Sequence, residues 1–178
     1  MATSIRSTTI LAVRRGERIA LAGDGQVTMQ NTVVKHTARK VRRIYHDRIV
    51  VGFAGATADA MTLSEKLEAK LERFNGNLKR SVVELAREWR ADKYLRRLEA
   101  LMIAADATGL FLISGSGDVI EPDQGVLAIG SGGVAAQSAA QALLTHTEMS
   151  ARSIAEAAMA IAGAICIFTN ETLTIEEV

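Results

Sequence analysis

Arg6-Ser7-Thr8-Thr9-Ile10-Leu11-Ala12-Val13 is a polar leader that runs straight into an apolar, β-branched stretch beginning with two threonines. A threonine hydroxyl is a weak nucleophile without a nearby base, and the residue's own backbone amine can act as that base once the preceding peptide bond is cut. Free α-amino groups titrate near about 7.7 to 8.0, against about 10.4 for lysine, so the amine is the better proton acceptor at neutral pH. The stretch therefore predicts removal of residues 1–7 and a nucleophile at Thr8. It also fits an ordinary β-strand, because β-branched residues pack well on a sheet.

Composition indicates one folded domain, residues 8–178, after the leader. Apolar residues make up 48% of the 178 positions and charged residues 23%, an ordinary globular balance. The net charge of +1 provides no global field for a nucleic acid or a membrane. Cys166 is the only cysteine, the leader has no apolar core, and no apolar run reaches the roughly 18 residues of a membrane span. We therefore expect a cytoplasmic protein with neither kind of partner.

Hydrophobic periodicity predicts strands, two helices, strands, two helices and strands, in that order. Two sheets rich in hairpins, each covered by a helical layer, would give an α/β fold in the form of a four-layer αββα sandwich. The expected strands are 9–14, 18–22, 40–45, 49–54, 100–106, 110–114, 126–129, 165–169 and 173–175. The first expected helix ends at Asn75–Asn77, and the others end near Arg97, Leu144 and Ile161. Met61 is placed on the buried stripe of the first.

Asp24 lies between two glycines where the second strand ends, beside the strand that follows Thr8. Its carboxylate either bonds only the local turn or faces Thr8. Residues 35–48 are strongly basic, which raises the alternative of a nucleic-acid patch. The near-zero net charge and a single interleaved aromatic, Tyr45, argue against that alternative. A second possibility is that one lysine of the run points at Thr8 and pairs with Asp24, since a buried ammonium needs a partner.

The glycine-rich segment 130–133 precedes an alanine-rich helix and invites comparison with an anion-binding loop. It lacks the lysine of a phosphate loop and the spacing of a dinucleotide fingerprint. We therefore expect this chain to bind no nucleotide.

Five ordered blocks together resemble the HslV (ClpQ) family, the proteasome-related peptidase subunits of bacterial HslUV proteases. The resemblance covers nearly all of the chain from Thr8, and the blocks are Thr8–Arg15, Ala22–Gln26, Ala38–Arg43, Gly52–Asp59 and Ala128–Gly133. It implies an N-terminal nucleophile hydrolase fold and a threonine-type endopeptidase.

The resemblance also implies a role for each matching residue. Thr8 would be the mature N-terminus and nucleophile, with Lys40 beside it and Asp24 as the partner of that lysine. Ser131 would help to hold the amine, and the backbone amide of Gly55 would face the developing oxyanion. A lysine charge near the amine would lower the amine's pKa.

For the assembly, the resemblance implies a homododecamer of two stacked hexameric rings, fed with unfolded proteins by hexamers of the ATPase HslU. ATP dependence would come from that partner. The resemblance further implies a sodium ion bound at Gly163, Cys166 and Thr169 through backbone carbonyls.

The chain departs from the family pattern in three places: Ser7 precedes Thr8 where a glycine is common, Ala164 replaces an acidic residue, and His36–Thr37 replaces a segment containing glycine. Two alternative functions fit the same fold. One is an amidohydrolase acting on a small molecule, and the other is a noncatalytic ring subunit that keeps its leader.

Overall fold

Strand β2 (Thr9–Arg15) is buried over most of its length because its alternating side chains enter two different cores. Leu11 and Val13 pack among residues of the last two helices. Ile10 and Ala12 face the opposite way, into a core formed between two sheets. The segment that follows Thr8 is therefore the centre of the molecule.

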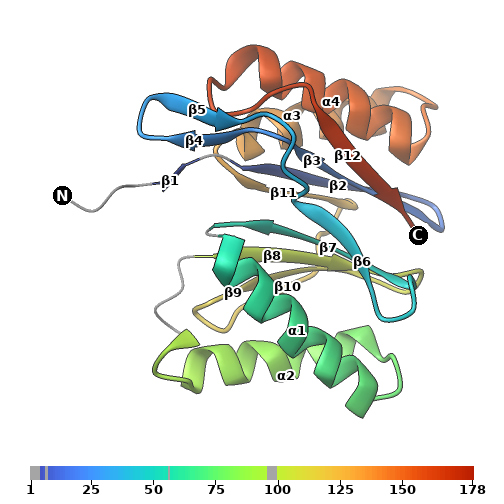
Figure 1. The fold of residues 1–178 in the computed structure, drawn as a ribbon. Coiled ribbons are helices and arrows are strands. Elements are labelled where there is room, and N and C mark those ends of the chain that lie inside the picture. The colour runs from blue at the N-terminus through green and yellow to red at the C-terminus, as the bar shows by residue number, and fades with distance from the viewer. Residues whose placement is uncertain (1–4, 7, 56, 96–99) are drawn as a thin grey trace.

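Two antiparallel sheets pack face to face, with a pair of helices on each outer side, which gives the expected four-layer αββα sandwich (Figure 1). The computed structural model describes residues 5–6, 8–55, 57–95 and 100–178, with only the backbone at 5–6 and 57–58. One sheet has the order β11-β2-β3-β12, and the other has the order β10-β9-β8-β7-β6. Their remaining strands are β3 (Arg18–Asp24), β6 (Val41–Ile44), β7 (Ile49–Ala54), β8 (Leu101–Ala105), β9 (Leu110–Ser114), β10 (Val119–Ile120), β11 (Val126–Gly130) and β12 (Leu173–Glu177).

A small third sheet lies at the edge where the N-terminal segment enters. It has the order β1-β4-β5 and consists of β1 (Ile5–Arg6), β4 (Val27–Met29) and β5 (Thr32–Lys35). The sequence pattern did not predict it. All four residues of β5 are exposed, and its sequence Thr-Val-Val-Lys does not alternate between apolar and polar residues. It therefore lacks the pattern of a half-buried strand.

The first helical pair is α1 (Thr57–Arg73) and α2 (Leu78–Ala91). Leu63, Leu67 and Leu71 are fully buried as predicted, whereas the prediction for Met61 was wrong, since it is 49% exposed. The second helix ends at Ala91, with Asp92 as its C-cap. The expected end at Arg97 falls among residues 96–99, outside the described ones.

The second helical pair is α3 (Gly133–His146) and α4 (Ala151–Ile165), and Ser150 caps α4 as predicted. The expected strand at 165–169 was wrong, because α4 continues to Ile165 and a turn follows. β-branched residues there suggested a strand, but the buried alanine stripe of α4 continues to Ala162.

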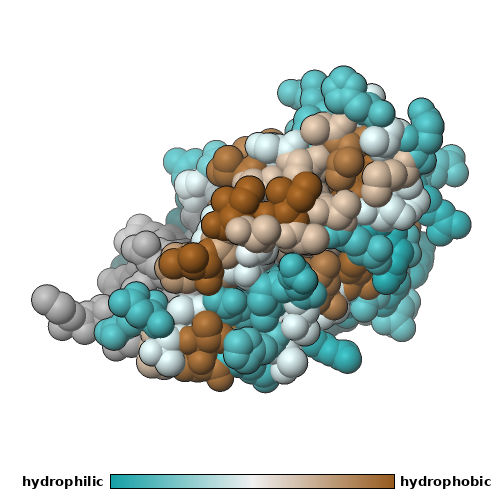
Figure 2. Space-filling view, turned by 90° about the horizontal axis from the view of Figure 1, so that it is seen from above, coloured by the Kyte–Doolittle hydropathy of each residue, from teal (hydrophilic) through white to brown (hydrophobic). Residues whose placement is uncertain are grey.

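The outer face of the second helical pair is partly apolar (Figure 2). Val134, Ile161, Ile165 and Ile167 are between 44% and 82% exposed. Among the residues described, no helix is both long and apolar enough to cross a membrane.

Candidate functional site

Thr8 immediately precedes β2 and is almost fully buried, with 8% of its surface exposed. Its carbonyl accepts a hydrogen bond from the backbone amide of Ser131 at 2.9 Å, and the Ser131 hydroxyl lies 3.5 Å from the same oxygen. Gly130 makes this approach possible: it has a φ of +91°, and a Cβ there would lie 1.8 Å from the Thr8 carbonyl oxygen. The structure thus brings Ser131 to Thr8 through the Thr8 carbonyl, while the predicted contact of Ser131 with the amine stays a prediction.

Asp24 ends β3 and is completely buried. Its Oδ1 accepts from the Thr9 amide at 2.8 Å and from the Lys40 ammonium at 2.7 Å. Its Oδ2 accepts from the amide of Gln26 at 2.9 Å. A buried carboxylate requires such partners, so Asp24 connects the start of β2 to the lysine.

Lys40 directly precedes β6, and only 9% of its side chain is exposed. Burial lowers the pKa of its ammonium group, and the charge of Asp24 and its hydrogen bond oppose that shift. The predicted inward-pointing lysine paired with Asp24 is therefore confirmed.

Thr8 and Lys40 line the same cavity, which has a volume of about 500 Å³. Gly55, at the end of β7, also lines it. Gly55 has a φ of +140°, a conformation that residues with a Cβ avoid. Thr8, Lys40 and Gly55 therefore surround one space, where a peptide carbonyl can approach the threonine.

Two polar residues that the sequence reasoning missed stabilise this arrangement. The Thr9 hydroxyl accepts from the amide of Gly132 at 2.9 Å and lies 2.7 Å from the hydroxyl of Thr169. Asn170 accepts from the Gly25 amide through its side-chain oxygen and donates to the His36 carbonyl. Thr9 is adjacent to the predicted nucleophile, but its partner is 160 positions away, so no local pattern reveals this contact.

The predicted sodium positions lie around the C-terminal end of α4. Cys166 is the C-cap of the helix, and its carbonyl accepts from the amide of Thr169 at 3.0 Å. A Cβ at Gly163 would lie 3.8 Å from the Thr169 carbonyl oxygen. In the described part of the chain, no group of three or more His, Cys, Asp and Glu side chains could hold a metal ion.

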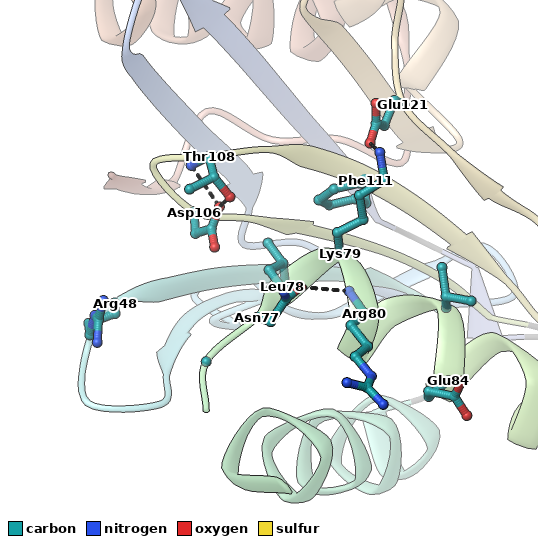
Figure 3. Close-up of a pocket in the computed structure, with 12 residues that line it drawn as sticks. Arg48, Asn77, Leu78, Lys79, Arg80, Glu84, Asp106, Thr108, Phe111 and Glu121 are labelled. Carbon is teal, nitrogen blue, oxygen red and sulfur yellow. Dashed lines mark hydrogen bonds and ion pairs between the residues drawn. The ribbon is translucent and has the colours of Figure 1, made fainter. Parts of the chain in front are cut away.

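A larger surface hollow of about 780 Å³ lies at the other end of β7 (Figure 3). It is lined by Arg48, which precedes β7, by the start of α2, and by Asp106 and Thr108 of the turn between β8 and β9. The Thr108 hydroxyl donates to Asp106 at 2.7 Å. By size alone this hollow would be chosen over the cavity at Thr8 as the candidate active site. However, its threonine, Thr108, is exposed and lies in an ordinary turn.

Comparisons with known proteins agree with this geometry. The proteasome subunit family matches residues 5–178. The ATP-dependent protease subunit HslV of Syntrophobacter fumaroxidans is 60% identical over 98% of both chains, and that of a Sulfurihydrogenibium strain is 60% identical with the same coverage.

The chain belongs to the HslV family.

The crystal structure of eukaryotic HslV from Trypanosoma brucei has the same fold as this chain. The TM-score is 0.90 at 49% identity, covering 95% of this chain and 98% of the other. The chain is therefore a proteasome-type threonine peptidase, the class of subunit that forms the proteolytic core of HslUV proteases.

Proposed function

We propose that this HslV-family chain uses Thr8, freed by removal of residues 1–7, to cut peptide bonds in unfolded proteins delivered by the HslU ATPase. The main support for this proposal is the buried Lys40–Asp24 pair beside Thr8. Burying two charges costs free energy, so a buried pair at the proposed nucleophile indicates a role in function. The names of the two bacterial relatives, each an ATP-dependent protease subunit, support the dependence on an ATPase.

The proposed chemistry uses groups that line or adjoin the cavity at Thr8. The Thr8 hydroxyl oxygen attacks the carbonyl carbon while the Thr8 amine takes the hydroxyl proton. The Gly55 amide donates to the developing oxyanion, a contact typically worth about 3 kcal/mol of barrier. The amine then protonates the leaving nitrogen, and water, activated by the same amine, hydrolyses the ester left on Thr8. Lys40 keeps the amine's pKa low by like charge, and Ser131 holds the Thr8 backbone in place.

Assembly into a homododecamer of two stacked hexameric rings in the cytoplasm completes the proposal. The exposed apolar side chains Val134, Ile161, Ile165 and Ile167 support it, since contact between copies would remove them from water.

A sodium ion at Gly163, Cys166 and Thr169 would be held by backbone carbonyls. The donor chemistry fits, because carbonyl oxygens are hard ligands and the Thr169 carbonyl passes close to Gly163. When bound, the ion would fix the turn that carries Thr169, whose hydroxyl contacts Thr9.

The proposal is tested by intact-mass spectrometry of the purified assembly together with degradation of an unfolded protein. We expect a chain that begins at Thr8 and degradation that requires both HslU and ATP. An active assembly that still carries residues 1–7 would contradict the role of Thr8. An assembled but inactive particle with its leader would favour a noncatalytic ring subunit, and hydrolysis of small amides alone would favour an amidohydrolase.

A further inference from the structure

The lining of the cavity at Thr8 divides into an apolar part and a basic part. The apolar side chains come from β4, β5, β7, α1 and the segment before β6, and they are Val27, Val34, Ala38, Phe53 and Ala60. Besides Lys40, three cations line the same space: Lys35, Arg39 and Arg42. A volume of about 500 Å³ lies within the range of ligand pockets.

These three cations differ from Lys40 in having no anionic partner among the described residues. Lys40 is paired with Asp24, whereas none of Lys35, Arg39 and Arg42 forms an ion pair with any residue that the structure describes. Lys35 and Arg39 are exposed, and Arg42 is half-buried.

Strand β6 shows the contrast within two adjacent residues. Neighbouring side chains of a strand point to opposite faces. Arg43 pairs with Glu176 at 2.7 Å and donates to the carbonyl of Glu177, so its charge is used within the fold. Arg42 lines the cavity instead, and its charge remains available to a substrate.

We propose that this cavity selects peptide segments that combine an apolar side chain at the attacked residue with a carboxylate side chain within two residues of the cut bond. The apolar side chain would contact Val27, Phe53 and Ala60, and the carboxylate would meet the cationic rim of Lys35, Arg39 and Arg42. The preference rests on the proposed function, since it concerns what Thr8 cuts. A nucleic acid is not the occupant, because apolar side chains line the same cavity as the cations and the chain as a whole carries a net charge of only +1.

The test uses the mature assembly with HslU and ATP and a matched set of peptides flanked by a fluorophore and a quencher. Each peptide keeps leucine at the attacked residue and carries Glu, Gln or Lys at one of the two positions on either side. At the best position we expect kcat/KM for the Glu peptide to exceed that for the Gln peptide by about five-fold and that for the Lys peptide by more, as charge complementarity requires. The ratio should fall as salt rises, because salt screens exposed charges.

Three variants locate the effect. Lys35→Gln, Arg39→Gln and Arg42→Gln should each lower the Glu-to-Gln ratio, and the triple variant should bring it close to one. Arg18→Gln is the matched control, because Arg18 is an exposed cation at the other end of the β2–β3 hairpin and its loss should leave the ratio unchanged.

The outcomes separate this inference from the proposed function. If peptides are cut in a Thr8-dependent manner with a wild-type ratio of one at every position, or if the triple variant keeps the wild-type ratio, the preference is overturned and the function stands. If none of the peptides and no unfolded protein is cut, the proposed function fails and the preference fails with it.

Discussion

Each of the two hollows at opposite ends of β7 has a threonine and a lysine in its lining and an aspartate in or beside it, yet only one has the geometry of a catalytic site. The first holds Thr8 and Lys40, with Asp24 behind them. The second, which is larger, holds Thr108, Asp106 and Lys79. A threonine, an aspartate and a lysine in a cavity are therefore not sufficient evidence of a site.

Burial and the hydrogen-bond partners of the two aspartates distinguish them. Asp24 is fully buried and accepts from the buried Lys40 and from backbone amides. Asp106 accepts from the hydroxyl and amide of Thr108 within its own turn. Lys79, whose side chain is 72% exposed, pairs with Glu121 and not with Asp106. In the first hollow, the Asp24 and Lys40 charges are held in place beside the threonine. In the second, the Asp106 carboxylate bonds its own turn and the Lys79 ammonium forms an exposed surface pair.

The largest expected difference between the hollows is in the two threonines. Thr8→Ala removes the hydroxyl that we propose attacks the peptide bond, and it should lower kcat for peptide hydrolysis by at least about 1,000-fold. Thr108→Ala removes only a hydrogen bond within a turn and should change kcat by less than about two-fold. Both variants are assayed as assembled particles of confirmed mass, with HslU and ATP present. Equal activities in the two variants would show that the site has been placed at the wrong end of β7.

The lysines provide the next comparison. Lys40→Met leaves the Asp24 carboxylate buried without its cation, a change that typically costs about 3–5 kcal/mol. It also removes the charge that we propose lowers the pKa of the Thr8 amine. Lys79→Met breaks a surface pair and should cost less than about 1 kcal/mol. Urea denaturation at one protein concentration measures both, and peptide hydrolysis should fall only for Lys40→Met. A Lys40→Met chain as stable and active as the wild type would refute the role of the buried pair.

Much of this arrangement was predictable from the sequence, because strong local patterns coincide with it. Alternation and turn residues located β2, β3 and β7, and glycines on both sides of Asp24 marked the strand end where the carboxylate lies. The need of a buried ammonium for a partner predicted that one lysine of residues 35–48 pairs with Asp24, and the resemblance to the HslV family identified that lysine as Lys40.

The missed features depend on contacts that no local pattern encodes. The hydroxyls of Thr9 and Thr169 meet across 160 positions. Strand β5 is exposed throughout, so the period-2 signal of a half-buried strand is absent. The end of α4 was misplaced because Ile165 and Ile167, although β-branched, lie exposed at a helix end and in a turn.

The smallest expected difference lies in two glycines with positive φ: Gly130, which lies against the backbone of Thr8, and Gly76, which lines the second hollow. A Cβ at Gly130 would lie 1.8 Å from the backbone oxygen of Thr8, whereas a Cβ at Gly76 would meet the ring edge of Tyr45 at 2.7 Å. Both alanine variants pay about 1–2 kcal/mol for the left-handed conformation. Only in Gly130→Ala must the backbone of Thr8 also shift, and this shift displaces the Thr8 carbonyl that Ser131 holds.

Because a shift of about 1 Å at a reacting group can cost up to 100-fold in rate, Gly130→Ala should lose at least about ten-fold in kcat. Gly76→Ala should keep wild-type kcat, since the Tyr45 ring can turn aside at a partly exposed position. Thermal denaturation and peptide hydrolysis of the two variants, measured side by side, separate a stability loss common to both from an activity loss confined to one. Full activity in Gly130→Ala would mean that the close approach of Gly130 to Thr8 does not position the nucleophile.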